Sequence, residues 1–154
     1  LVFISDLFKL QEENYKKLNI NPELDEYKIR ARQNLELHVK VSDLASKTNC
    51  FAYTTDVKND FDKDVILLKF VQCLKQVLTI GINNGYNTLE EVSINHNEYC
   101  LSDQFLNLYI DINDLIISRS EDHFETLLED LLSIGNTLGL SEEEIVKKFD
   151  ELSN

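Results

Sequence analysis

The helix predicted over residues 64–81 is apolar on almost every side, and it is the feature that most constrains the fold. Its apolar residues fill consecutive positions as well as positions three or four apart, so they surround most of its circumference. Such a helix must be covered, and we expect it at the centre of a domain or in a subunit interface. The apolar residues are Val65, Ile66, Leu67, Leu68, Phe70, Val71, Cys73, Leu74, Val77, Leu78 and Ile80.

One side of this helix carries a polar stripe. The stripe consists of four residues at i, i+3, i+6 and i+7, namely Lys69, Gln72, Lys75 and Gln76. A second predicted helix, residues 28–47, has Lys40 and Asp43 at i and i+3. Paired carboxylates at this spacing on two facing helices would bind magnesium, since hard cations prefer oxygen ligands. Here the spacing suits a metal site, but most of the side chains are cations or amides.

The scarcity of turn-forming residues predicts long helices. The chain has four glycines and one proline in 154 residues, which is few for a protein built from many β-turns. We expect a single all-α domain over residues 1–154, a helical bundle with central helices at about 28–47 and 64–81. In the first half of the chain we predict a helix over 3–18, a helix start at Asn21-Pro22, a long helix from about Asp25 to Lys47 and a polar loop over 54–64. The helix over 64–81 is predicted to stop at Gly81 and Asn83-Asn84-Gly85. Beyond it we predict a helix capped by Ser102, another over about 120–138, and a last helix with a capping box of Ser141 and Glu144. Residues 86–100 are ambiguous between a short hairpin and an irregular segment.

Charge and cysteine content exclude several classes of function. The formal net charge of −13 repels nucleic-acid phosphates and anionic membranes, so we expect neither as a partner. The three cysteines form no CxxC motif, which favours reduced thiols over a zinc site or a disulfide framework. No uninterrupted apolar run reaches the ~18 residues of a membrane span. We expect a cytoplasmic protein.

Two segments resemble a known family. DLASKTNCFAYTT (43–55) and DVILLKFVQCLKQVLTIG (64–81) resemble blocks of the dimeric all-α dUTPases, members of the all-α NTP pyrophosphatase superfamily. LFKLQEENYKKL (7–18) and LLSIGNTLGLSEEEIVKKF (131–149) are similar to further blocks, so the resemblance covers nearly the whole chain. It implies that family's helical bundle and a homodimer built across the central helices. It also implies the chemistry of enzymes that hold magnesium with ExxE and ExxD motifs and split dUTP into dUMP and pyrophosphate.

The resemblance also implies where the site should lie. The family's metal-ligand positions fall on four residues of this chain, Lys40, Asp43, Lys69 and Gln72. Only Asp43 is a carboxylate, so we expect no metal there. The family's later histidine falls on Lys75, and an asparagine and a glutamate of its first block fall on Ser46 and Lys47.

Several hypotheses about function follow. The leading one is a dUTPase-like pseudoenzyme that acts through protein–protein contacts or metal-free nucleotide binding, without a cofactor. The candidate nucleotide-binding residues are Lys40, Ser46, Lys47, Lys69 and Lys75. The alternative is an active dUTP or dNTP diphosphatase that uses magnesium through Asp43 and other carboxylates. A plainer interpretation is that these residues form an ordinary solvated polar face.

Overall fold

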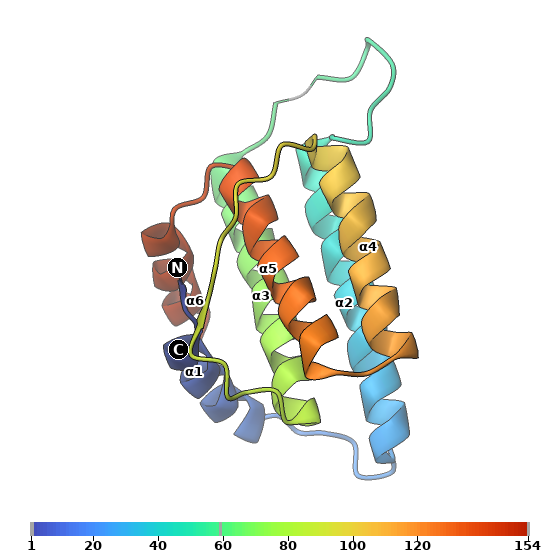
Figure 1. Ribbon diagram of the computed structural model, residues 1–154, viewed down its shortest axis with the longest axis vertical. Coiled ribbons are helices and arrows are strands. Elements are labelled where there is room, and N and C mark those ends of the chain that lie inside the picture. The colour runs from blue at the N-terminus through green and yellow to red at the C-terminus, as the bar shows by residue number, and fades with distance from the viewer. Residues whose placement is uncertain (1, 59, 154) are drawn as a thin grey trace.

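Helix α3 (Lys63–Asn84) runs through the middle of the computed structural model, and the other helices pack around it (Figure 1). The structure describes residues 2–58 and 60–153. The other helices are α1 (Ile4–Lys16), α2 (Glu26–Thr48), α4 (Leu101–Ile117), α5 (Glu121–Thr137) and α6 (Glu142–Leu152). Helices α2 to α5 run alongside one another, while α1 and α6 cover the opposite side of α3 (Figure 1). The predicted all-α bundle and both central helices are confirmed.

The interior of the bundle explains the unusual composition of α3. Helix α3 packs against α1, α2, α5 and α6, and its side chains from Ile66 to Ile80 are mostly buried. By length and hydropathy α3 could cross a membrane, but 61% of its most apolar window is buried inside the protein. Core helices of globular domains have the same properties. Its apolar faces are therefore covered within one protomer, and no subunit interface is needed to explain them.

The ambiguous segment 86–100 is an extended strap across the bundle. Its strand β2 (Glu91–Val92) pairs antiparallel with β1 (Val2–Phe3) at the start of the chain, so the strap forms no hairpin with itself. The backbone N–H groups of Ile4 and Ser5 donate to the carbonyl of Glu90 at 2.9 and 3.1 Å. This pairing joins the N-terminus to the connection between α3 and α4.

Helix α2 begins four residues later than Asn21-Pro22 predicted. The side chain of Asn21 accepts a hydrogen bond from the N–H of Glu23 at 3.0 Å, which makes a local turn. The cap is Asp25, whose carboxylate accepts from the N–H of Lys28 at 2.8 Å. Proline after asparagine fits a turn as well as a helix start, and this turn connects α1 to α2.

The predicted stop at Gly81 is wrong, whereas the stop at Asn83-Asn84-Gly85 is confirmed. Gly81 lies inside α3, where an added Cβ would sit 2.6 Å from the ring of Phe124. This glycine allows α5 to approach α3 closely. Gly85 is the C-cap, with φ of 79°, a conformation that glycine adopts without steric cost.

The capping predictions for the C-terminal helices are partly confirmed. Ser141 caps α6 and accepts from the N–H of Glu144 at 3.1 Å. Ser102, however, is not a cap, because α4 already begins at Leu101 after Cys100, which has extended backbone and no capping side-chain bond. A serine in the first turn of a helix gives the same sequence signal as a serine just before it.

Candidate functional site

Helices α2 and α3 bring the predicted polar residues together along their shared groove. The buried face of α2 consists of Leu37, Val41, Leu44 and Thr48. Lys40 and Asp43 lie beside this face, at the edge where α2 packs against α3. The helical periodicity of the two helices therefore places one polar stripe against the other.

Asp43 is surrounded by lysines. Its Oδ2 lies 2.9 Å from the Nζ of Lys69 on α3, and its Oδ1 lies 3.3 Å from the Nζ of Lys47 on α2. The hydrogen bond from Lys69 is the main reason that the pKa of Asp43 lies below its ordinary value, with Lys47 adding to it. Both oxygens of the carboxylate already have cationic partners.

Lys40 makes a separate set of contacts, one turn away. Its Nζ donates to Oε1 of Gln76 on α3 at 3.2 Å and lies 3.5 Å from the carboxylate of Glu36. Gln76 is only 4% exposed, and its Nε2 donates to the carbonyl of Gln33 at 2.9 Å. Gln76 therefore ties α3 to α2 through both ends of its amide.

These residues do not fit a magnesium ion. Magnesium requires octahedral oxygen ligation, which it commonly obtains from carboxylates and water. Asp43 supplies one carboxylate here, and the two ammonium groups beside it repel a divalent cation. Among residues 2–58 and 60–153, no group of three or more histidines, cysteines or acidic residues could hold a metal ion.

The other three predicted residues are Ser46 on α2 and Gln72 and Lys75 on α3. Ser46 is turned back to its own helix, where its hydroxyl donates to the carbonyl of Asp43 at 2.7 Å. Gln72 is half-buried on α3. Lys75 donates to the hydroxyl of Ser153 at 3.1 Å and lies 4.7 Å from the ring centre of Phe149, so it contacts α6. Burial and the charge of Lys40 lower the pKa of Lys75.

A pocket of about 390 Å³ lies between α1, α2, α3 and the connection after α1. Lys40 and Lys75 line it, which places two of the predicted nucleotide-binding residues at one cavity. Its other polar lining residues are Gln11, Tyr15, Asn21, Arg32, Gln33, Glu36, Gln76 and Thr79, and its apolar ones are Leu18, Ile20, Leu24 and Ile29. The pocket combines apolar walls, amide groups and cations, a mixture typical of small-molecule sites.

Two carboxamides in this pocket have unused acceptors. The Oε1 atoms of Gln11 and Gln33 are buried without a hydrogen-bond partner. Gln11 is only 6% exposed, and its Nε2 donates to the hydroxyl of Thr79 at 3.0 Å, which fixes the orientation of the amide. Since a buried unpaired acceptor costs about 1–3 kcal/mol, a ligand that offers N–H groups would be favoured. Asn14, one turn further along α1, also has a buried unpaired Nδ2.

No sequence motif predicted Gln11 and Gln33 as site residues. Gln11 lies within the segment 7–18 that resembles the family, and that block was a usable signal. Gln33 lies on the long helix without any motif around it. Only the packing of α1 and α2 against α3 reveals that the two side chains line the same cavity.

The fold is an all-α bundle whose two central helices carry polar stripes that meet along one groove. A family model described as dUTPase matches residues 3–152, so the chain belongs to the all-α dUTPase family. No match was found among curated proteins or among solved structures.

Proposed function

We propose that this dUTPase-fold protein has lost hydrolysis and binds a nucleotide without metal in the pocket between α1, α2 and α3. The observation that carries this proposal is the ion pair of Asp43 with Lys69 at 2.9 Å. It places an ammonium group beside the one carboxylate that the family's ligand positions retain in this chain.

The loss of hydrolysis follows from the requirements of the reaction. Release of pyrophosphate needs metal ions to neutralise phosphate oxygens and to generate the attacking hydroxide. It also needs a base to accept the proton of water. A lysine ammonium can neutralise phosphate charge, but neither it nor a glutamine amide can generate the attacking hydroxide or accept the proton of water. The pKa of Asp43 is lowered by Lys69, which makes it a weaker base.

Nucleotide binding is supported by the pocket. Lys40 and Lys75 offer ammonium groups to phosphate oxygens, and charge-assisted bonds of this kind are the strong ones. At the inner wall, Gln11 and Gln33 offer unpaired acceptors to the N–H groups of a base. Neither interaction requires a divalent ion.

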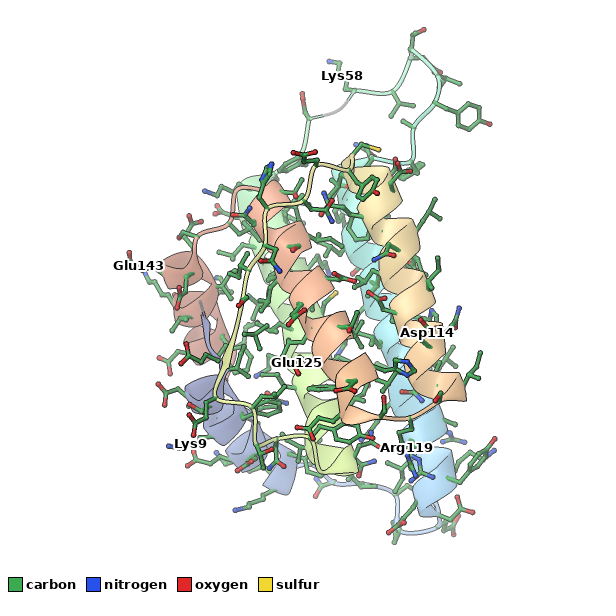
Figure 2. All side chains as sticks on the ribbon, viewed as in Figure 1. Lys9, Lys58, Asp114, Arg119, Glu125 and Glu143 are labelled. Atoms are coloured by element: carbon green, nitrogen blue, oxygen red, sulfur yellow. The ribbon has the colours of Figure 1, made fainter. Side chains whose placement is uncertain are left out.

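Two assays test this proposal. Incubation with a panel of deoxynucleoside triphosphates and magnesium or manganese should release no pyrophosphate above background. Calorimetry with dUTP in excess EDTA should show binding, weakened about tenfold by Lys40→Ala, since a hydrogen bond to a charged group is worth roughly 1.5–3 kcal/mol. Lys58→Ala is the matched control, because Lys58 lies on the loop that projects from the far end of the bundle (Figure 2). If the unmodified protein hydrolyses dUTP and Asp43→Ala abolishes this, the active alternative is correct.

We also propose that the protein forms a homodimer, through α2 and α4 rather than through α3. The two helices pack side by side and present large exposed apolar residues at helical spacing, namely Tyr27, Leu35, Val39, Leu106, Ile110 and Ile117. Exposed apolar residues gathered on neighbouring helices are typical of an interface. Light scattering at low micromolar concentration should give twice the 17.9 kDa chain mass, and Ile110→Lys should give the monomer. A monomer from the unmodified chain would disprove it.

A further inference from the structure

A pair of carboxyl groups lies between α4 and α5, outside the groove of α2 and α3. Asp111 on α4 is 7% exposed, and its Oδ2 is buried without any donor. Asp130 on α5 lies close enough that a hydrogen bond between the two carboxyl groups is among the causes that raise the pKa of Asp111. Asp130 in turn accepts from Nδ2 of Asn107, one turn before Asp111, at 3.0 Å.

The chemistry of this contact requires a proton. Two ionised carboxylates repel each other and neither can donate, so a hydrogen bond between them forms only when one is a carboxylic acid. Asp111 is the more buried of the two carboxyl groups, and burial disfavours its ionised form, so the proton lies on Asp111. The ion pairs among residues 2–58 and 60–153 involve neither residue, so no lysine or arginine compensates the charge.

The surroundings add negative charge and no fixed positive charge. The titratable groups near the α4–α5 interface and its adjoining grooves are Asp103, Tyr109 and Asp114 on α4, Glu125 and Glu129 on α5, His38 on α2 where it stacks on Tyr109, and His96, Glu98 and Tyr99 in the strap. Burial, followed by the contact with Asp130 and the charge of Asp114, raises the pKa of Asp111 to about 8. The pKa of Glu129 is also raised, mainly by burial and then by Glu125 and Asp130.

We propose that Asp111 and Asp130 form a proton-dependent clamp that holds α4 against α5 while one carboxyl is protonated and loosens their packing when both ionise. Helix α4 packs against α5 along its length (Figure 1). The clamp therefore controls a helix whose outer side carries the exposed Leu106, Ile110 and Ile117. It acts independently of the nucleotide pocket, which α4 and α5 do not line.

The sign of the pH effect follows from proton linkage. Between the ordinary aspartate pKa of 3.8 and a pKa of about 8, the folded protein holds a proton on Asp111 that the unfolded chain has released. Stability therefore falls as pH rises through this window, by up to about tenfold in the folding equilibrium constant per pH unit, and levels off above it.

Denaturant unfolding from pH 6 to 9 tests the clamp. The midpoint concentration of the unmodified protein should fall across this range, and Asp111→Asn should abolish most of the fall, because asparagine keeps the donor at every pH. Asp122→Asn is the matched control, since Asp122 is exposed in the first turn of α5, is not among the groups that raise the pKa of Asp111, and should leave the fall in place. Parallel pH profiles for the unmodified protein and Asp111→Asn would overturn the proposal.

A second measurement does not depend on a substituted chain. Carbon-13 NMR of the aspartate carboxyl groups should show one group with a midpoint near pH 8, and a full set of midpoints near 4 would refute the clamp.

Amide hydrogen exchange, corrected for its intrinsic pH dependence, should accelerate at pH 9 in α4 and α5 more than in α1 and α3. Equal acceleration in all four helices would show that the pair does not act on α4 and α5 specifically.

Discussion

The two helix pairs of this protein solve the same electrostatic problem in opposite ways. Between α2 and α3, the carboxylate of Asp43 is compensated by two lysines, and its pKa is lowered. Between α4 and α5, the carboxyl of Asp111 meets another carboxyl, and its pKa is raised. The first arrangement keeps its charge at neutral pH without a metal. The second keeps a proton, because nothing else neutralises it.

This comparison indicates how a metal site can be lost without loss of the fold. A carboxylate cage between two helices is unstable without its cation, since like charges repel at short range. In the proposed function, lysines at part of the cage remove the need for the metal, and the helices stay packed through Leu37, Val41 and Leu44. Under the proposed function, the family fold persists in a chain whose ligand positions no longer suit magnesium.

The largest expected effect comes from converting the site between α2 and α3, where lysines compensate a carboxylate, into a cluster of carboxyl groups like that between α4 and α5. The triple variant Lys40→Glu, Lys69→Glu, Gln72→Asp places carboxylates at all of the family's ligand positions. Without magnesium it should unfold at a lower temperature than the unmodified protein. With magnesium at ~100 times its dissociation constant it should recover about 2.7 kcal/mol of stability.

Thermal unfolding with and without magnesium measures this recovery. Lys9→Glu with Lys58→Glu is a control that adds carboxylates at two exposed and widely separated positions outside the groove (Figure 2), and magnesium should leave its melting temperature nearly unchanged. A triple variant that is indifferent to magnesium would show that these positions are not arranged as a cage.

Much of the fold could be predicted from sequence, because helix periodicity and turn residues act locally. The capping box at Ser141 and the C-cap at Gly85 depend only on nearby residues, and both are observed. Gly81 could not be interpreted correctly, because its role depends on Phe124, a residue of another helix. Local patterns identify which residues can end a helix but not which residues pack against it.

The candidate site shows the same limit. The spacing on two helices, together with the family resemblance, predicted that Lys40, Asp43 and Lys69 share a groove, as they do. The sequence did not reveal that Lys75 turns to Ser153, or that Gln11 and Gln33 line one pocket. The pairing of Asp111 with Asp130 also depends on how α4 and α5 are aligned, which no local motif specifies.

A smaller effect separates the two arrangements by pH. A carboxyl with a lowered pKa contributes stability above its ordinary pKa of 3.8 and loses it as pH falls through the lower folded value. Asp43→Asn should therefore cost about 0.3–1 kcal/mol at pH 7, a magnitude expected for a partly exposed ion pair, and nearly nothing at pH 2. Asp111→Asn should instead become more favourable as pH rises from 6 to 8. Denaturant titrations of both variants over pH 2–9 should give opposite slopes, and slopes of equal sign would contradict the comparison.

The smallest effect concerns salt. The side chains of Asp43 and Lys69 are 37% and 24% exposed, so their attraction is partly screened by water and further screened by ions. A double-mutant cycle with Asp43→Asn and Lys69→Gln should give a coupling energy of ~0.5 kcal/mol at low ionic strength, and about half of that in 1 M sodium chloride, where the Debye length is ~3 Å. Lys63→Gln with Glu144→Gln, an exposed pair at 3.2 Å between α3 and α6, provides the reference cycle and should lose a similar or larger fraction of its coupling in salt. An Asp43–Lys69 coupling that salt leaves unchanged would mean that the pair is shielded from solvent and contributes more to the α2–α3 packing than its exposure indicates.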